Sequence, residues 1–351
     1  MLSIQKNKMK FWGLGILLFV IMTASACSSS QSGETESPEN SGPKKDIVIG
    51  GGSLGGIYYT LAGAIGDLLQ TELDTVERAS ALTGSSNQFI AQMQSGNVDL
   101  SMATPDNVYF GWSDEEGQGW KEGESNDKVN IMAAGYINIM ALVAKKDSNI
   151  ETIEDIGEGA VGVLSSTLQE PMEEYLKAHG IENPNVVIIG DWNQMGQALR
   201  DGSIDVMQAI AAHPMPAVME LSTSLDLKLV ESKNETAVDT FLEGITTKFF
   251  QRIVLPAGTY DWLTEDYHTV GRGTILTATT DLSEDQVYEM TKLIYESADK
   301  LSQVHPLAAD FNLEMFQEYL DAGTIQVPIH PGARRYFEEK GLTIPDSVPK
   351  N

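Results

Sequence analysis

The first apolar segment of the sequence runs into a glycine-rich turn whose spacing is used by two kinds of enzyme site. Residues 47–49 are apolar, and glycines follow in the spacing of a dinucleotide-binding loop, at Gly50, Gly52 and Gly55. The same turn places Ser53 between Gly51 and Gly55, which is the spacing of the nucleophile elbow of serine hydrolases.

Both enzyme readings lack their other parts. No acidic residue clearly ends the second expected strand, where a dinucleotide site needs one. The five histidines lie in no recognisable catalytic context: His179, His213, His268, His305 and His330. We therefore expect no cofactor, no metal and no enzyme activity, and keep a secreted serine hydrolase using Ser53 as the alternative function.

A third kind of site uses a feature that these two share, the free N–H groups and positive dipole end of a helix N-terminus. Small polar residues recur where an expected strand gives way to an expected helix, at 53–56, 83–87, 104–107 and 165–167. Each is also an ordinary N-cap, but all four follow the carboxyl ends of strands, where ligands bind in open α/β sheets. We therefore predict that they converge on one anionic ligand.

The candidate ligand-binding residues are these polar residues together with two aromatic residues that could form a wall of the site. They are Ser53, Gly55, Tyr58, Tyr59, Thr83, Ser85, Ser86, Thr104, Asp106, Ser165, Ser166 and Thr167. Among them, Asp106 could accept an ammonium group, which would favour an amino acid as the ligand.

Short apolar strands and amphipathic helices alternate around these turns. Strands are expected at 47–49, 76–82 and 98–103, with helices at 57–69 and through 89–93. This alternation is typical of a parallel sheet that helices cover.

The C-terminal part of the sequence predicts helices and little strand structure. Helices are expected at 284–301 and 313–320, and Ser283 with Gln286 fits a capping box. Residues from 251 onward carry little strand signal, so we expect them to pack back mainly on the first lobe.

Four residues recur 106 positions further along the chain in matching context. The pairs are Gly84 and Gly190, Gln88 and Gln194, Gly96 and Gly202, and Asp99 and Asp205. In both copies a helix is expected to end at a glycine, which tolerates the left-handed C-cap, and a buried strand follows. The repeat predicts two similar lobes, at 47–140 and 141–250, with 251–351 as the C-terminal segment.

An export signal precedes this body. Three lysines, Lys6, Lys8 and Lys10, come before an apolar run at 11–22 that is too short to span a bilayer stably, and Cys27 follows Ala24-Ser25-Ala26. The position of this cysteine predicts a lipoprotein signal at 1–26 with lipid on Cys27, although cleavage by ordinary signal peptidase would also suit Ala24 and Ala26. Residues 27–46 are expected to form a disordered tether.

The composition limits the possible partners. The 351 residues carry a formal charge of −27, and Cys27 is the only cysteine. Loss of the signal removes three lysines, so the mature chain is near −30. A surface this acidic repels nucleic acid and anionic headgroups. We expect a monomer, held at the membrane by the lipid on Cys27.

Several ordered motifs over residues 47–341 resemble those of the TAXI family, the solute-binding proteins of tripartite ATP-independent periplasmic (TRAP) transporters. The similar segments are Ile49-Gly50-Gly51-Gly52, Gly55-Gly56-Ile57-Tyr58-Tyr59, Ser95-Gly96-Asn97-Val98-Asp99-Leu100, Asp201-Gly202-Ser203-Ile204-Asp205, Leu255-Pro256-Ala257-Gly258-Thr259-Tyr260 and Ile329-His330-Pro331-Gly332-Ala333.

The resemblance implies a two-lobed α/β fold of the periplasmic-binding-protein type (type II). Each lobe would be a mostly parallel sheet with helices on both faces, and the cleft would lie between the lobes. It also implies that the protein captures a small carboxylate, glutamate-like or a dicarboxylate, and delivers it to TRAP membrane permease subunits outside the cytoplasm. The loop at 163–168 lacks the glycine that the family usually has there, which allows a ligand other than glutamate.

Overall fold

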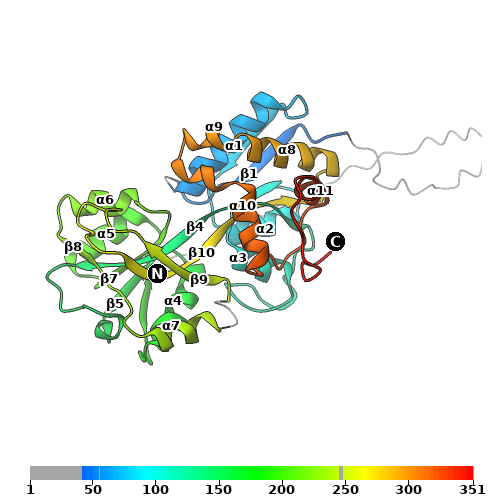
Figure 1. Cartoon of the computed structure of the whole chain (residues 1–351). Coiled ribbons are helices and arrows are strands. Elements are labelled where there is room, and N and C mark those ends of the chain that lie inside the picture. Colours follow the sequence, from blue (N-terminus) through cyan, green and yellow to red (C-terminus); the bar gives the residue numbers. More distant parts are fainter. Residues whose placement is uncertain (1–41, 55, 245–247, 351) are drawn as a thin grey trace, which may run out of the picture. The chain divides into compact units, whose positions relative to one another are not determined.

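The computed structural model describes residues 42–54, 56–244 and 248–350 (Figure 1). The predicted signal peptide, Cys27 and most of the predicted tether lie outside the described residues, as does Gly55. Among the described residues, no helix combines the length and the apolar composition that a membrane span requires.

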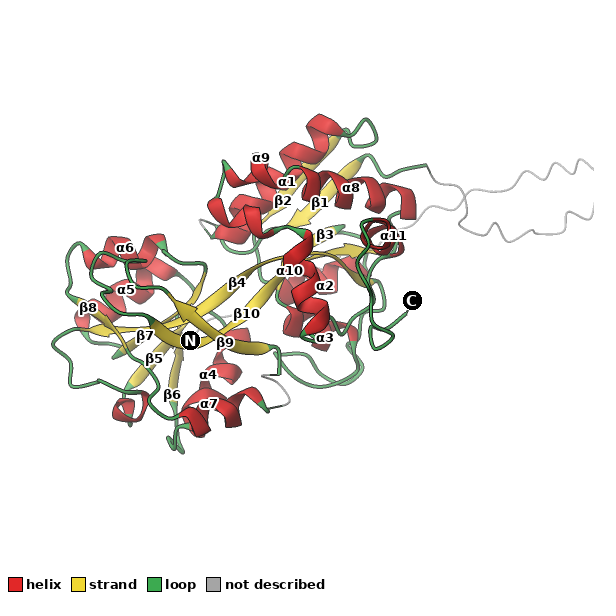
Figure 2. Ribbon diagram, in the orientation of Figure 1, coloured by secondary structure: helices red, strands yellow, loops and turns green. Residues whose placement is uncertain are grey.

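The described strands form one mixed sheet in the order β2-β1-β3-β10-β4-β7-β5-β6, with β8 beside β4 and β9 beside β10 (Figure 2). Their bounds are β1 (Asp46–Gly50), β2 (Arg78–Leu82), β3 (Leu100–Ala103), β4 (Val129–Lys145), β5 (Ala160–Val163), β6 (Asn185–Ile188), β7 (Val206–Ala211), β8 (Leu227–Leu229), β9 (Phe250–Leu255) and β10 (Tyr267–Thr279).

We call first lobe the part built from β1–β3 and the helices α1 (Ile57–Glu72), α2 (Ser86–Gln94), α3 (Pro105–Trp112), α8 (Glu284–Glu296), α9 (Ala298–Ser302), α10 (Leu313–Asp321) and α11 (Pro331–Glu339). The second lobe contains β5–β8 and the helices α4 (Ser166–Ala178), α5 (Trp192–Asp201), α6 (Pro216–Ser222) and α7 (Glu235–Leu242). Two 3-10 helices complete the elements, η1 (Ile153–Ile156) and η2 (Pro306–Asp310).

The predicted parallel pairing is present in each lobe. β1 pairs in parallel with β2 and β3, and β5 pairs in parallel with β6 and β7. Between these groups lie the long strands β4 and β10, which are antiparallel to each other and to their other neighbours β7 and β3. Both strands run from one lobe into the other (Figure 2).

The expectation of little strand structure after residue 250 is wrong, because β9 and β10 form there. In β10, glycine and threonine interrupt the apolar residues, so no continuous apolar run marks the strand. Gly271 and Gly273 are needed for packing. A Cβ added at Gly271 would meet the backbone oxygen of Asn138, and a Cβ added at Gly273 would meet the Tyr319 ring.

Three clusters of buried apolar side chains form the core. One fills the first lobe and takes in the ends of β4 and β10 that lie there, together with side chains from α8 to α11. The other two belong to the second lobe and include residues of β9 and of the start of β10. Residues 250–270 therefore pack with the second lobe, and the chain from residue 275 packs with the first.

The internal repeat has a structural counterpart. The backbone N–H of Asp99 donates to the Val48 carbonyl, and its carboxylate accepts from the Val48 N–H, both at 2.9 Å. Asp205 makes the same two bonds to Ala160, both at 2.8 Å. Each aspartate thus fixes the start of one strand to the start of the strand that opens its lobe.

The predicted helix at 284–301 is divided at Ser297 into α8 and α9. Ser283 caps α8 as predicted, because its hydroxyl accepts from the Gln286 N–H at 3.3 Å. The reciprocal half of a capping box is not made. The Gln286 amide instead accepts from the Lys44 N–H at 3.0 Å and donates to the Lys44 carbonyl at 2.6 Å.

Candidate functional site

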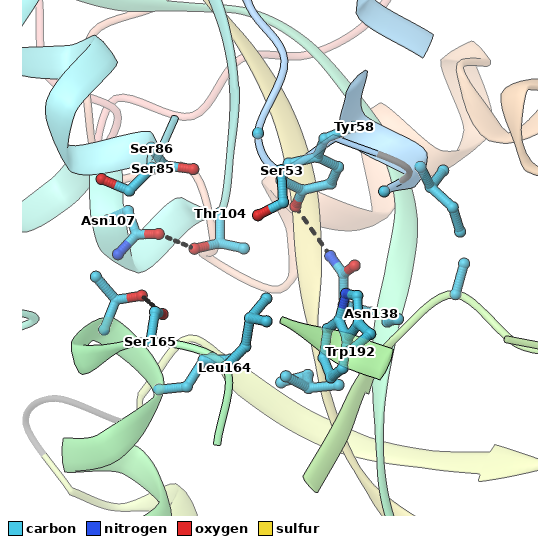
Figure 3. Close-up of a pocket in the computed structure, with 18 of the residues that line it drawn as sticks. Ser53, Tyr58, Ser85, Ser86, Thr104, Asn107, Asn138, Leu164, Ser165 and Trp192 are labelled. Atoms are coloured by element: carbon cyan, nitrogen blue, oxygen red, sulfur yellow. Dashed lines mark hydrogen bonds between the residues drawn. The ribbon is translucent and has the colours of Figure 1, made fainter. Parts of the chain in front are cut away.

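A cavity of about 310 Å³ lies between the two lobes (Figure 3). Its described lining from the first lobe is Gly52, Ser53, Gly56, Ile57, Tyr58, Gly84, Ser85, Ser86, Thr104 and Asn107. The long strands β4 and β10 contribute Tyr136, Asn138 and Arg272. The second lobe contributes Leu164, Ser165, Thr167, Leu168, Gly190, Trp192, Ile210, Ala211 and Ala212.

Seven of the twelve predicted site residues line this cavity, namely Ser53, Tyr58, Ser85, Ser86, Thr104, Ser165 and Thr167. Four others are not among the described lining residues: Tyr59, Thr83, Asp106 and Ser166. The twelfth, Gly55, lies outside the described residues. The four turns do come together from both lobes, although not every residue in them faces the cavity.

The predicted helix N-termini differ in how their backbone N–H groups are satisfied. At α1, α3 and α4, the N-cap residues Gly56, Thr104 and Ser165 make no side-chain cap hydrogen bond. At α2, Ser85 and Gln88 form a reciprocal capping box. All four turns were predicted to bind the ligand in the same way. In the structure, α1, α3 and α4 keep N–H groups free of side-chain caps beside the cavity.

Hydrogen bonds among the lining side chains leave a donor at the first-lobe wall. The Thr104 hydroxyl donates to Oδ1 of Asn107 at 2.9 Å. Nδ2 of Asn107 is buried and has no hydrogen-bond partner among the described residues. The Ser86 hydroxyl is already used, because it donates to the Met102 carbonyl at 3.2 Å.

Tyr58 is held by polar contacts as well as by packing (Figure 3). Nδ2 of Asn138 donates to the Tyr58 hydroxyl at 3.1 Å and to the Thr274 hydroxyl at 2.8 Å. The Tyr58 hydroxyl lies 3.3 Å from the Ala103 carbonyl, to which it donates. Burial raises the pKa of Tyr58 above its usual value, so the phenol stays neutral at physiological pH.

Arg272 is the residue of the site that sequence reasoning missed most clearly. It lines the cavity from β10 with only 4% of its side chain exposed, and it forms an ion pair with the fully buried Asp106 of α3. Its guanidinium also lies 5.2 Å from the centre of the Phe250 ring. A signal was present in the sequence, because Arg272 is the only charged residue within 269–279.

The ion pair is incompletely satisfied. Nε of Arg272 and Oδ1 of Asp106 are buried and have no hydrogen-bond partner among the described residues. The carboxylate of Asp106 is therefore committed to a guanidinium and does not lie on the cavity surface as the predicted ammonium acceptor. Arg272 instead places a guanidinium at the cavity, and its Nε has no partner among the described residues.

The apolar side of the cavity was not predicted either. It is formed by residues at the end of β5, in α4, at the start of α5 and at the end of β7, namely Leu164, Leu168, Trp192 and residues 210–212. Gly190 and Trp192 lie in a fifth strand-to-helix turn, at the positions that the repeat makes equivalent to Gly84 and Ser86. No histidine is among the lining residues in the described part of the chain, and no described His, Cys, Asp or Glu residues group as a metal site would.

Comparison with solved structures identifies chains of similar architecture. The periplasmic aliphatic sulphonate binding protein SsuA from Escherichia coli is 11% identical with a TM-score of 0.46, over 87% of this chain and 95% of that one. The amino acid ABC transporter substrate-binding protein AbpA from Streptococcus pneumoniae, bound to L-arginine, is 15% identical with a TM-score of 0.45, over 76% and 93%.

The architecture confirms the predicted fold class. Two α/β lobes share a mixed sheet, two long strands join them, and a cavity lies between them. The model of the NMT1-like family matches residues 49–341. This match spans well over half of the 351 residues, and the chain therefore belongs to the NMT1-like family.

Proposed function

We propose that this protein is the extracytoplasmic solute-binding component of a TRAP transporter of the TAXI type. It captures a small carboxylate between its lobes and delivers it to the membrane permease subunits. A lipid on Cys27 holds it at the membrane. It has no catalytic role, because binding and release of the solute require no covalent step.

The carboxylate class is supported by one observation above all, the surplus of hydrogen-bond donors at the first-lobe wall. Nε of Arg272 and Nδ2 of Asn107 are buried donors without described partners. The N-termini of α1 and α3 add backbone N–H groups without side-chain caps. A buried donor without a partner costs about 1–3 kcal/mol, and a bound carboxylate oxygen would remove that cost.

An acidic protein can bind an anionic ligand where the cavity itself attracts anions. The chain carries a formal charge of −27, but no acidic side chain is among the described residues that line the cavity. The positive ends of the helix dipoles at the cavity favour an anion, and Arg272, whose charge Asp106 balances, adds hydrogen-bond donors. Electrostatic attraction inside the cavity therefore does not depend on the net charge of the surface.

The alternative function, a serine hydrolase using Ser53, finds less support. The Ser53 side chain does face the cavity (Figure 3). A nucleophilic serine needs a base within hydrogen-bond reach, and no histidine is among the described lining residues. A serine-reactive fluorophosphonate probe tests this directly, because labelling of Ser53 would favour the hydrolase and its absence the binding protein.

A thermal-shift panel of amino acids, dicarboxylates and 2-oxo acids tests the proposed function. A ligand that contacts both lobes stabilises the folded chain in proportion to its occupancy, by about 2.7 kcal/mol at a hundredfold excess over Kd. We expect at least one carboxylate to raise the melting temperature by several degrees. A panel that leaves the melting temperature unchanged throughout would contradict the carboxylate assignment.

A further inference from the structure

The two walls of the cavity differ in chemistry. The first-lobe wall presents polar groups, from Ser53, Ser85, Ser86, Thr104 and Asn107. The second-lobe wall is mainly apolar, with Leu164, Leu168, Trp192 and Ile210. In Figure 3, Leu164 and Trp192 lie across the cavity from Ser85 and Thr104.

The polar groups that do occur on the second-lobe wall are largely used. The hydroxyl groups of Ser165 and Thr167 lie 2.8 Å apart and hydrogen-bond to each other. A ligand that touches both walls therefore meets mainly polar groups on one side and, apart from the N-terminus of α4, mostly carbon atoms on the other.

Charge limits the ligand to one carboxylate. Arg272 is the only charged side chain among the described lining residues, and Asp106 already takes part of its guanidinium. One carboxylate can accept from the free N–H groups of Arg272 and Asn107. A second carboxylate on the same ligand would be buried without a cation, and burial of an unpaired charge is strongly unfavourable.

An ammonium group on the ligand is disfavoured for a separate reason. The N-termini of α1, α3 and α4 present the positive ends of helix dipoles to the cavity. The nearest carboxylate, that of Asp106, is fully buried, is paired with Arg272 and is not part of the described lining. Among the described lining residues there is therefore no carboxylate for an α-ammonium group.

We propose that the ligand is a small monocarboxylate without an ammonium group, which carries an aliphatic or aromatic tail. Arg272 and Asn107 hold the carboxylate, and Leu164, Leu168 and Trp192 pack on the tail. The proposal rests on the proposed function and narrows the carboxylate class to acids such as branched-chain 2-oxo acids. A cavity of about 310 Å³ is at the lower end of ligand pockets, roughly 300–1,000 Å³, and suits a molecule of this size.

Calorimetry on the purified full-length chain with four probes tests the proposal. 4-Methyl-2-oxopentanoate has one carboxylate and an apolar tail. 2-Oxoglutarate keeps the 2-oxo acid head but adds a second carboxylate, L-leucine replaces the oxo group by an ammonium group, and 4-methyl-2-pentanone lacks the carboxylate. We expect 4-methyl-2-oxopentanoate to bind at least about tenfold more tightly than each of the others, which corresponds to about 1.4 kcal/mol.

A variant on the apolar wall locates the tail. Leu164→Ser should weaken binding of 4-methyl-2-oxopentanoate about tenfold, a typical effect of losing apolar contact in a pocket. Binding of pyruvate, which has the same head and no branched tail, should stay unchanged. Leu293→Ser is the matched control, because Leu293 is also a partly buried leucine but belongs to the first-lobe core and does not line the cavity. If Leu164→Ser does not fold, the order of the four probe affinities for the wild-type chain still tests the proposal.

The outcomes separate this proposal from the proposed function. Tighter binding of 2-oxoglutarate or L-leucine would overturn the monocarboxylate proposal and leave solute capture in place. Equal binding of 4-methyl-2-pentanone and 4-methyl-2-oxopentanoate would show that the carboxylate does not contribute to binding. That result would contradict the carboxylate in this proposal and in the proposed function. Failure of all four probes, together with L-glutamate and succinate, would contradict both.

Discussion

Arg272 of β10 and Asp106 of α3 form a buried ion pair beside the cavity, although they are 166 positions apart in the sequence. The pair forms only because β10 inserts between β3 and β4. It holds the guanidinium in place while Nε of Arg272 remains without a partner among the described residues. The same contact therefore joins distant parts of the fold and positions the charge of the site.

Removing the charge of Arg272 alone should destabilise the fold. Arg272→Gln leaves the fully buried carboxylate of Asp106 without its cation, and breaking a buried pair in this way typically costs about 3–5 kcal/mol. Urea unfolding at neutral pH measures the loss.

The double variant Arg272→Gln with Asp106→Asn should recover most of that stability, because a neutral amide pair of similar shape replaces the ion pair. An equal loss in the single and double variants would show that the uncompensated carboxylate is not the cause.

A second contact links the two lobes. The N–H of Gln118, in the loop between α3 and β4, donates to the Glu170 carboxylate of α4 at 2.9 Å. The Gln118 carbonyl accepts from Nδ2 of Asn87 at 2.7 Å, and its backbone has a φ of +52°, in the left-handed region. The loop thus connects the start of α2 with the second lobe.

Glu170→Ala should weaken binding of a carboxylate probe by up to about tenfold. A hydrogen bond to a charged group contributes about 1.5–3 kcal/mol, and this one supports the arrangement in which both walls face one ligand. Glu173→Ala is the control, since the Glu173 carboxylate accepts a hydrogen bond from Gln169 and pairs with Lys177, both in its own helix. Calorimetry compares the two, and equal affinities in both variants would show that the Gln118 link does not support binding.

His330 should make the stability of the fold depend on pH. It caps α11, where Nδ1 accepts from the Gly332 N–H, and burial lowers its pKa to about 4. An unfolded histidine has a pKa of about 6.5. Between these values the unfolded chain binds the proton that the folded chain excludes, so stability falls as the pH drops from about 6.5 to 4, by up to about 3 kcal/mol.

His330→Asn retains an N-cap side chain and should flatten this part of the stability profile. Urea unfolding at pH 7, 5.5 and 4 gives the profile of each protein. The other histidines are present in both, so the difference between the profiles isolates His330. Parallel profiles would contradict a neutral buried His330.

The proposed anchor predicts a change in fractionation. If Cys27 carries the lipid, Cys27→Ser should move the protein from the membrane fraction to the soluble fraction, because the tether and the acidic body offer no other strong membrane affinity. Immunoblots of separated fractions measure it. Unchanged partitioning would refute lipidation of Cys27.

Much of the fold follows from local patterns in the sequence. The repeat of Asp99 and Asp205 predicted two equivalent lobes, and each aspartate bonds the opening strand of its own lobe in the same way. The strand-to-helix turns were predictable because small polar residues follow short apolar runs. These features depend on neighbours in the chain, which single-sequence patterns record well.

The parts that were missed depend on distant contacts. Gly271 and Gly273 interrupt the apolar pattern of β10 because Asn138 and Tyr319 approach them too closely for a side chain. This requirement arises only when the sheet and α10 are assembled, so the local sequence does not reveal it. For the same reason, Arg272 was not among the predicted site residues, and Asp106 was predicted to accept an ammonium group although it pairs with Arg272. Their pairing exists only in three dimensions.

The most direct test of carboxylate capture at Arg272 is a calorimetric titration of 4-methyl-2-oxopentanoate into the wild-type chain and into the Arg272→Gln, Asp106→Asn double variant. The double variant keeps a neutral, matched pair at this position, and its melting curve confirms that it is folded. We predict a loss of affinity of about ten- to a hundredfold, as expected when a hydrogen bond to a charged group is removed. Equal affinity in the two proteins would contradict the site proposed for the carboxylate.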